Sequence, residues 1–386
     1  MINFLERKIF EYCLANSEFF EKIGRPLSYF LNGNDPEKVH ERALELLNKY
    51  QDVVEKISPS FDFPNLHVDV AGKSVMPFGN AEGMDKNGVV LYPLSKIFGF
   101  VSIGTVPLNA RGGNEKPRVF VDGRNGNVYN AQGFPSRGAK IARRNAVIYK
   151  RVKCGEKLLF SNLCGMPSSS DEKGIKNSYR ELETLVRDFS RISDGIIWNP
   201  YSPNTDSLKL LRTRDVFRAS AKIISDVVGK EKLKLVKMGP YDDSEEERKN
   251  WLFLVDAFLE GGGNGIVAVN TYMVPRDKVP AANWGYPSAG VSGRFLRDFR
   301  QRAICDARKN FGKDVFIIAT GGIVSADEAF KSFQAGANLL SGYTPYILHG
   351  LGLIKKIAEG LETKLNELGY KTLEEFQKSK DYNSAR

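Results

Sequence analysis

The polar segment 198–205 is the stretch of this chain best suited to chemistry on a bound ligand. It follows the apolar run 195–198, which predicts a buried strand, and it offers two amides and two hydroxyls between and beside two prolines. Each proline ring fixes its own φ and restricts the residue before it, so the loop should hold its side chains at fixed angles. We expect Ser202 to act on a planar, hydrogen-bonding ligand that Asn199 and Asn204 help to hold. The alternative is an ordinary turn, because Asn, Pro and Ser are common turn residues.

Eight short apolar runs follow residue 77 and alternate with segments of helical period. The runs are 77–83, 98–104, 159–163, 195–198, 234–238, 265–269, 315–319 and 337–340. The clearest helical segments are 179–192, 216–228, 244–259, 294–311 and 326–333. This alternation favours an α/β fold with a parallel sheet, and eight strands match a (β/α)8 TIM barrel. A doubly wound open sheet is the alternative, although no Gly-x-Gly-x-x-Gly motif follows the first run.

In such a barrel, functional side chains lie where the strands end and the loops begin. These positions carry a polar, glycine-rich set: Ala81, Glu82, Gly83, Lys86, Gly104, Thr105, Asn162, Asn199, Ser202, Lys237, Asn270, Thr271, Gly321, Gly322, Gly342, Tyr343 and Thr344. Any one of these loops is explained by turn chemistry alone. Eight of them on the same rim predict a ligand site.

The loops after the last two runs predict a phosphate site. Gly321-Gly322 and Tyr343-Thr344 occupy the place where barrels bind phosphate, and Ser292-Gly293, in the expected loop after the run 265–269, adds amide donors. Glycines let backbone N–H groups approach the ligand, and a helix N-terminus adds positive potential. A phosphorylated cofactor or substrate is therefore expected.

Lysines and amides at the rim indicate what else the ligands carry. Lys86 and Lys237 are expected on opposite sides of the barrel mouth, where positive charge suits an electron-rich ring that becomes anionic on reduction. Asn130, expected in a loop between the second and third runs, joins Asn199 and Asn270 as amides that can both donate and accept. A carboxylated, imide-bearing ring would fit these groups.

The N-terminal part differs in character from the barrel. Residues 1–34 carry many aromatic and aliphatic side chains at helical spacing, which predicts short amphipathic helices that pack on the barrel or lie in a membrane interface. Asp35 and Pro36 are typical of a helix start, as N-cap and first helical residue. We expect a small helical, membrane-associating segment over 1–60, a barrel over 61–369 and a tail over 370–386, with one surface helix around Leu373 and Phe376. No run of 18 uncharged apolar residues predicts a spanning helix, and no secretory signal is recognised.

Composition excludes several other classes. Four scattered cysteines (Cys13, Cys154, Cys164 and Cys305) predict neither a zinc site nor a disulfide framework and fit a reducing compartment. Three histidines argue against a histidine-rich metal centre, and no metal is expected. The net charge of +10 is unevenly distributed: the segment from Arg137 to Lys153 contains seven basic residues and no acidic one. That stretch is interpreted as a solvated helical face, a nucleic-acid patch, an anionic membrane contact or a surface that steers an anionic substrate.

Residues 35–360 resemble one known family, the dihydroorotate dehydrogenases. The resemblance rests on motifs in a specific order: Met84-Asp85-Lys86-Asn87-Gly88, Gly113-Asn114-Glu115-Lys116-Pro117-Arg118, Asn130 with Gly133-Phe134, Ser202-Pro203-Asn204-Thr205, Val236-Lys237, Asn270-Thr271, Val291-Ser292-Gly293, Gly321-Gly322 and Tyr343-Thr344. The N-terminal helices resemble the membrane-associated, quinone-using class. So does the serine at position 202, where the soluble enzymes carry cysteine.

The resemblance implies FMN-dependent oxidation of dihydroorotate to orotate in pyrimidine synthesis, with a quinone as electron acceptor. Ser202 would be the catalytic base; since serine is a weak base, Thr205 and water would have to relay its proton. The implied substrate residues are Lys86, Asn130, Gly133, Phe134, Asn199, Asn204, Thr205, Asn270 and Thr271. The implied cofactor residues are Ala81, Glu82, Gly83, Thr105, Asn130, Asn162, Asn199, Lys237, Ser292, Gly293, Gly321, Gly322, Tyr343 and Thr344. The protein would lie peripherally on the cytoplasmic face of an inner membrane, or on an organellar inner membrane, through its N-terminal helices.

Four positions depart from the family pattern. Glu82 stands beside the expected flavin where a second alanine is usual, and it could disfavour reduced flavin or pair with a nearby lysine. Val121 replaces an arginine at the mouth of the quinone tunnel. Pro135 replaces a substrate-side asparagine, and Leu108-Asn109 replaces a proline-rich turn.

Three other functions remain as alternatives. One is a related flavin enzyme with another acceptor or an altered substrate, which Glu82 and Val121 favour. A second is an RNA-acting, dihydrouridine-synthase-like barrel, but none of the four cysteines has the Asn-Gly-Cys context of that loop acid. The third is a non-catalytic membrane scaffold, against which the intact rim residues argue. We expect no nucleic-acid partner.

Overall fold

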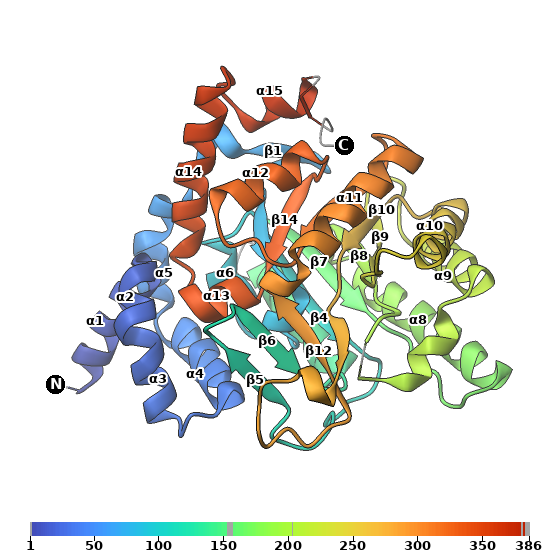
Figure 1. Cartoon of the computed structure of the whole chain (residues 1–386), viewed down its shortest axis with the longest axis horizontal. Helices are drawn as coiled ribbons and strands as arrows, with labels where there is room; N and C mark the ends of the chain where they lie inside the picture. Colours follow the sequence, from blue (N-terminus) through green and yellow to red (C-terminus); the bar gives the residue numbers. More distant parts are fainter. Residues whose placement is uncertain (1, 153–156, 203, 380, 383–386) are drawn as a thin grey trace.

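Eight parallel strands close into a barrel in the computed structural model, which describes residues 2–152, 157–202, 204–379 and 381–382 (Figure 1). Around the barrel the strands run β3(Phe78–Asn80), β4(Phe100–Val106), β7(Leu158–Leu163), β8(Gly195–Trp198), β9(Leu233–Met238), β10(Gly265–Ala268), β13(Phe316–Thr320) and β14(Leu339–Gly342). Each of the eight predicted runs overlaps one of them. The (β/α)8 barrel is therefore confirmed, and the open sheet is wrong.

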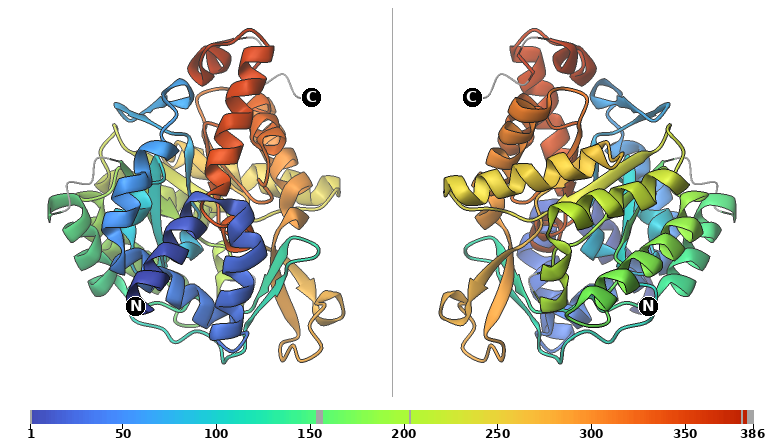
Figure 2. Two further views of the ribbon diagram at one scale, coloured as in Figure 1. Left: turned by 90° about the vertical axis from the view of Figure 1, so that its left-hand side faces the viewer. Right: turned by 90° about the vertical axis from the view of Figure 1, so that its right-hand side faces the viewer.

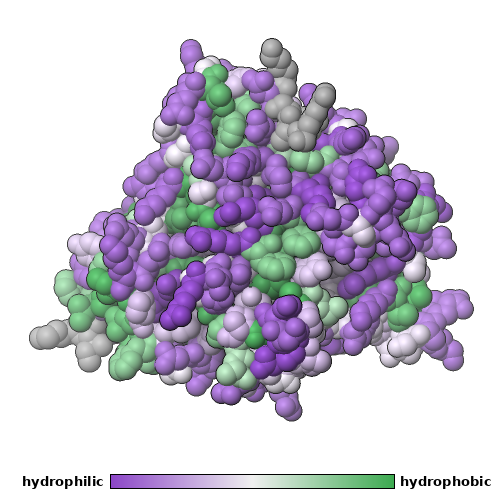
Figure 3. All heavy atoms as spheres, in the orientation of Figure 1, coloured by the Kyte–Doolittle hydropathy of each residue, from purple (hydrophilic) through white to green (hydrophobic). Residues whose placement is uncertain are grey.

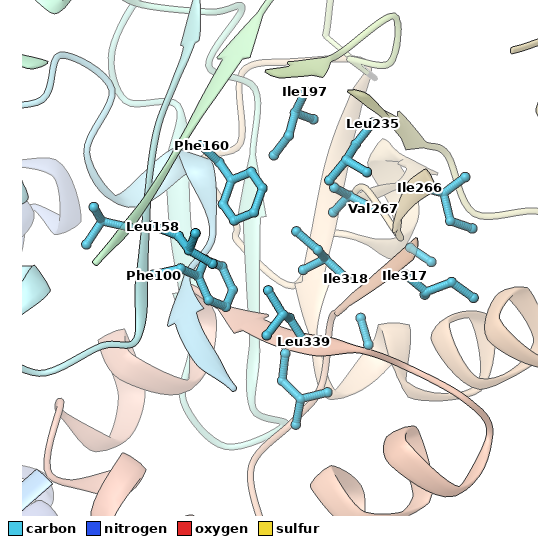
Figure 4. Close-up of a cluster of buried hydrophobic side chains, with 14 of the residues drawn as sticks. Phe100, Leu158, Phe160, Ile197, Leu235, Ile266, Val267, Ile317, Ile318 and Leu339 are labelled. Carbon is cyan, nitrogen blue, oxygen red and sulfur yellow. The ribbon is translucent and has the colours of Figure 1, made fainter. Parts of the chain in front are cut away.

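The barrel strands are apolar on both faces because side chains fill the interior and helices cover the outside. Figure 4 shows part of this buried cluster, with side chains from β4, β7, β8, β9, β10, β13 and β14. Phe100 and Phe160 meet edge to face, with ring centroids 5.5 Å apart. The interior is thus a packed core, and ligands can bind only at its ends.

Helices on the outside follow the predicted segments. They are α8(Glu172–Ser190), α9(Arg214–Val227), α10(Glu245–Glu260), α11(Arg297–Phe311) and α12(Ala326–Gln334). A further outer helix, α14(Leu353–Glu367), was not among the predicted segments. Thr213, Ser244 and Ser325 cap three of them by accepting a hydrogen bond from a backbone N–H in the first turn. Their apolar stripes pack on the barrel.

A four-stranded antiparallel sheet over the barrel mouth was not predicted. Its strands are β11(Tyr272–Pro275), β12(Ser288–Gly293), β6(Asn127–Asn130) and β5(Val119–Asp122), in that order. Figure 2 shows these two hairpins side by side, away from the end that carries the C-terminus. Asn130 and Ser292 lie on strands β6 and β12, so the prediction that both lie in loops is wrong. We call this four-stranded unit the mouth sheet.

Short helices precede the barrel and pack beside the mouth sheet. They are α1(Ile2–Ala15), α2(Ser17–Phe19), α3(Arg25–Leu31), α4(Pro36–Lys49) and α5(Gln51–Ile57), with a π-helical turn over Phe20–Gly24. Asp35 accepts hydrogen bonds from the N–H groups of Glu37 and Lys38, which confirms the predicted cap. Arg118, just before β5, forms a buried ion pair with Glu37 at 3.1 Å and so fastens α4 to the mouth sheet. In the described part of the chain, no helix combines the length and the apolar character needed to cross a bilayer.

The basic stretch after residue 137 is partly accounted for by structure. It covers α7(Ala139–Val147) and the following π-helical turn, where Lys150 pairs with Asp194 at 2.5 Å. Arg143 donates to the backbone oxygen of Asp188. Lys153 and Cys154 lie outside the described residues. The other basic side chains of α7 are exposed, which agrees with a solvated helical face.

The C-terminal tail contains the predicted helix, α15(Leu373–Lys378), which lies at the end of the barrel opposite the mouth sheet (Figure 1). Thr372 and Glu375 form a capping box at its start. Leu373 and Phe376 are fully buried, and the Tyr382 hydroxyl donates to the backbone oxygen of Gly336 at 2.7 Å. The helix is therefore packed onto the barrel; the boundaries of the three segments stay a prediction.

We predict that Phe376→Ala lowers the free energy of unfolding by about 3–5 kcal/mol, because it leaves a cavity in a filled core. Phe376 packs against Phe330, Tyr370 and Tyr382. Phe30→Ala is the matched control: Phe30 is 77% exposed and should change stability by no more than about 0.5 kcal/mol. Urea denaturation followed by circular dichroism measures both. Equal midpoints for the two variants would contradict the packing of α15.

Candidate functional site

A cavity at the barrel mouth brings together nearly all of the predicted site residues. Of the expected catalytic, substrate and cofactor residues, only Thr205 and Asn162 are absent from its lining. The cavity measures about 170 Å³, less than the roughly 300–1,000 Å³ of most ligand sites, so a ligand of ordinary size would extend beyond it. We call this space the mouth cavity.

Amide side chains that line the mouth cavity form two hydrogen-bonded sets, which we call the amide network. Asn199 donates to Thr105 Oγ1 at 2.8 Å, and Asn270 donates to Asn199 Oδ1 at 3.2 Å. Asn204 donates to Asn130 Oδ1 at 3.0 Å. These bonds hold the amides in fixed positions and use only part of their capacity, since each amide has two N–H donors and two acceptor lone pairs.

Ser202 lies buried in the loop after β8 and lines the mouth cavity. Its Oγ accepts hydrogen bonds from the Asn204 backbone N–H and from Thr205 Oγ1, both at 3.3 Å. Pro203, which stands between Ser202 and Asn204 in the sequence, lies outside the described residues. Thr205 thus touches Ser202 without reaching the cavity. Because Thr205 already donates to it, Ser202 has its own O–H free to point into the cavity.

Lys86 projects into the mouth cavity from the loop after β3. The carboxylate of Asp85 holds this loop by accepting from the N–H groups of Val89 and Val90 at 2.9 and 2.8 Å. Burial lowers the pKa of Lys86 to about 8. An ammonium with this pKa is mostly charged at neutral pH and costs little to neutralise above it.

Glu82 and Lys237 form a buried ion pair inside the mouth cavity. Both side chains are almost fully shielded from solvent. The sequence left open whether Glu82 pairs with a nearby lysine. The structure shows that it does, and that the partner is Lys237 rather than Lys86. Lys237 faces the cavity as half of a neutral pair and not as a lone positive charge.

The predicted phosphate residues form a cradle whose glycines are required by geometry. Gly293, Gly321 and Gly322 have φ values of 100°, 110° and 70°, which side chains rarely adopt. A Cβ on Gly293 would lie 2.2 Å from the backbone oxygen of Gly126. Beside them, the hydroxyls of Ser292 and Thr344 are 2.8 Å apart. Backbone N–H groups can thus approach an anion here closely, as the sequence predicts.

Asn162 on β7 carries the clearest sign of a missing partner. Its side chain is fully buried, and neither amide atom has a hydrogen-bond partner among the residues that the structure describes. Leaving such groups unpaired is costly, so native proteins rarely do. Asn162 does not line the mouth cavity, so its side chain would have to turn toward a ligand there to gain these partners. The donors and acceptors present, together with the glycine cradle, fit a phosphorylated ligand with a hydrogen-bonding ring.

A second, larger cavity of about 620 Å³ lies between the N-terminal helices and the mouth sheet. Its lining is mostly aliphatic and aromatic, and it includes Val121. Val119, Val128 and Tyr343 line both this cavity and the mouth cavity, so the two are neighbours across a single layer of side chains. We call the larger space the apolar cavity.

The mostly apolar lining of this cavity also includes polar residues, which are Glu6, Arg25, Ser28, Asn32, His40 and Arg42. The His40 ring meets the Tyr343 ring edge-on, with centroids 5.8 Å apart. Burial lowers the pKa of His40 to about 3, so its imidazole is neutral at physiological pH. Position 121 is a valine where the family resemblance places an arginine, and the cations in the cavity lining are Arg25 and Arg42.

The helices that form one wall of the apolar cavity carry exposed hydrophobic side chains. They are Phe4, Leu5, Tyr12, Ile23, Phe30 and Leu31. Figure 3 shows hydrophobic surface gathered on the side where α1–α3 lie. Scattered single residues would need no explanation, but a group on one face is typical of an interaction site.

Sequence reasoning missed the mouth sheet's contribution to both cavities. Val119 and Val128 come from β5 and β6, which the sequence analysis treated as loop. A signal was present: Asn125-Gly126, between two short apolar segments, is a typical hairpin turn. Tyr201 and Leu296 also line the mouth cavity and carry no such signal.

Comparisons with known proteins agree with this geometry. A family model described as dihydroorotate dehydrogenase matches residues 65–365. The chain is 31% identical to the dihydroorotate dehydrogenase (quinone) of a Nitratiruptor species, over 92% of this chain and 97% of that relative. It is 31% identical to the enzyme of the same name from Salinispora arenicola, over 89% and 99%. A ligand-free crystal structure of DHODH from Eimeria tenella superposes with a TM-score of 0.72 at 25% identity, over 87% of this chain and 98% of that one. The chain belongs to the dihydroorotate dehydrogenase family of oxidoreductases, and it resembles the quinone class of that family over most of its length.

Proposed function

We propose that this protein oxidises dihydroorotate to orotate with FMN in the mouth cavity and passes the electrons to a quinone in the apolar cavity. The observation that carries the proposal is the adjacency of the two cavities. One is polar and rich in amides, the other is apolar, and Val119, Val128 and Tyr343 line both. A polar substrate and an apolar acceptor can thus use one cofactor from two sides.

The cofactor would lie between the glycine cradle and the Glu82–Lys237 pair. Its phosphate would bind Ser292, Gly293, Gly321, Gly322, Tyr343 and Thr344. Thr105, Asn162, Asn199 and Lys237 would meet the ring and ribityl chain, along with Ala81, Gly83 and Asn130. When bound, FMN supplies a hydride acceptor that can release the electrons singly or in pairs.

The substrate would be held by the amide network. Asn130, Asn199, Asn204, Asn270 and Thr271 can pair with the carbonyl and N–H edges of a pyrimidine ring, beside Gly133 and Phe134. Lys86 would bind the carboxylate. Ser202 would take a proton from the substrate carbon as the hydride leaves the neighbouring carbon. Thr205, bonded to Ser202, and water would carry that proton away.

The acceptor would enter through the N-terminal helices. A quinone with an apolar tail suits a cavity with this lining, and the exposed hydrophobic group on α1–α3 suits the membrane from which such a molecule comes. The protein would therefore lie on the cytoplasmic face of an inner membrane, or on an organellar inner membrane, without crossing it. The quinone class named for the relatives supports this placement.

Val121 favours one second candidate, a dihydroorotate-oxidising enzyme that uses a different acceptor. Valine leaves that part of the apolar cavity wall without the usual cation. Turnover with dihydroorotate and a soluble dye, without turnover with a quinone analogue, would establish this candidate and overturn the quinone proposal.

Ser202→Ala is predicted to slow the reduction of bound flavin by dihydroorotate by about 10²–10⁴-fold, the usual contribution of a general base. Flavin content should stay unchanged. Among the described residues, the Ser202 hydroxyl forms hydrogen bonds only with Asn204 and Thr205, and neither is a proposed cofactor residue. Anaerobic stopped-flow absorbance measures the rate. Ser170→Ala, in the exposed loop after β7, is the control. Bleaching of the Ser202 variant at the wild-type rate at neutral pH would contradict its role as base.

Binding of orotate is predicted to weaken above pH 8. The pKa of Lys86 is about 8, and the ammonium form binds the carboxylate, so affinity is retained below pH 8 and lost above it. From pH 8 to 9 the charged fraction falls from about a half to about a tenth, and Kd should rise about fivefold. The perturbation of flavin absorbance by orotate measures Kd. Lys86→Met should bind weakly at every pH, while Lys173→Met, at an exposed position, should match the wild type. A constant Kd from pH 7 to 9 in the wild type would exclude Lys86 as the carboxylate partner.

Filling the apolar cavity should block only the second half of the reaction. Ala43 on α4 lines it, and Ala43→Trp should weaken acceptor binding about tenfold or more, because overpacking costs about 1–3 kcal/mol. Reduction of the flavin by dihydroorotate should stay within about twofold of wild type, since that step uses the mouth cavity. Steady-state assays with a quinone analogue measure the loss, and the exposed Ala282→Trp is the control. Normal quinone kinetics in Ala43→Trp would remove the apolar cavity as the acceptor site.

A further inference from the structure

The Glu82–Lys237 ion pair crosses the mouth of the barrel. Glu82 lies in the short 3-10 turn that follows β3, and Lys237 lies on β9. In the strand order these two strands are opposite one another, four places apart in either direction around the barrel. Both side chains line the mouth cavity together with Thr105 and Asn199. The pair therefore spans the floor on which a cofactor ring would rest.

Burial makes the pair hard to separate. In the part of the chain that the structure describes, the only ion pair of Glu82 is with Lys237. Moving the ammonium away would leave a buried carboxylate without a compensating charge, which is strongly destabilising. The pair should therefore persist when a ligand lies above it.

The charge of this pair matters to a flavin, because the reduced ring is an anion and the oxidised ring is neutral. A lone ammonium beside the ring would stabilise the reduced form more than the oxidised form, which raises the reduction potential. Glu82 cancels most of that field at short range, since the two opposite charges are in contact. Glutamate in place of the alanine usual in the family thus changes the electrostatics of the site.

Resting on the proposed flavin function, we propose that Glu82 is a positioning residue that lowers the reduction potential of the bound flavin by pairing with Lys237. Two electrons and one proton pass from dihydroorotate to the ring as a hydride, and Ser202 takes the second proton. The same two electrons then leave for the acceptor. A lower potential makes the first transfer less favourable and the second more favourable, so this flavin is suited to an acceptor of low potential.

Redox titration of the purified holoenzyme tests the proposal, with a reference dye and anaerobic absorbance spectra at pH 7. Glu82→Gln keeps the size and a hydrogen bond but removes the charge, and Glu82→Ala restores the residue usual in the family. At a fixed solution potential, both should raise the ratio of reduced to oxidised flavin at least tenfold, which is a shift of about 30 mV for a two-electron couple. Glu82→Asp keeps the charge and should stay close to wild type. Glu245→Gln, which removes an exposed carboxylate on α10, is the control and should leave the ratio unchanged.

The proposal would be overturned if the ratio of reduced to oxidised flavin, at the same solution potential, differed by less than threefold between wild type and both Glu82→Gln and Glu82→Ala. A lower potential in either variant would also overturn it. If Glu82→Gln fails to hold flavin, Glu82→Ala decides by the same criterion. Failure of the proposed function is distinguished beforehand: a wild-type protein that binds no flavin, or whose flavin dihydroorotate does not reduce, refutes that function without reference to Glu82.

Discussion

The mouth of the barrel buries hydrogen-bonding groups that do not have enough protein partners. This shortage decides what the site above the core must bind. Eight parallel strands end at one rim, and their apolar side chains fill the interior below it. Above that core, Asn162 has no partner among the described residues for either amide atom, and the other amides are bonded only in part. A fold that keeps such groups dry and rigid is arranged for a ligand that completes them.

The N-terminal helices extend this site with an environment of the opposite kind. The Arg118–Glu37 ion pair, buried and bidentate, attaches α4 to the segment that leads into the mouth sheet. The apolar cavity forms between them and meets the mouth cavity at Val119, Val128 and Tyr343. Under the proposed function, a polar substrate and an apolar acceptor would use the same cofactor without entering the same space. Glu82 would then change the charge beneath the bound ring.

The barrel and the rim residues could be predicted because their signals are local. Strands buried on both faces give apolar runs such as 195–198, and the residues that follow, such as Ser202, reach the rim by topology alone. The hairpin of β5 and β6 has a turn signal at Asn125-Gly126, but the mouth sheet as a whole could not be predicted, because these strands are four residues each and β6 pairs with β12 from a distant part of the chain. The partner of Glu82 was equally hidden, since 155 residues separate it from Lys237. Asn162 was predicted at the rim from its place near the end of a strand, and the family resemblance implied that it binds the cofactor. That neither of its amide atoms has a partner among the described residues is evident only in three dimensions.

The central claim is that the mouth cavity holds a flavin that dihydroorotate reduces. An absorbance spectrum of the purified protein, recorded before and after anaerobic addition of dihydroorotate, tests it most directly. We expect flavin absorbance at the start and bleaching on addition, followed by recovery when a quinone analogue is supplied. A colourless protein would contradict the cofactor assignment. Flavin that stays oxidised in the presence of dihydroorotate would contradict the substrate assignment and turn attention to Glu82 and Pro135, the two departures at the mouth cavity.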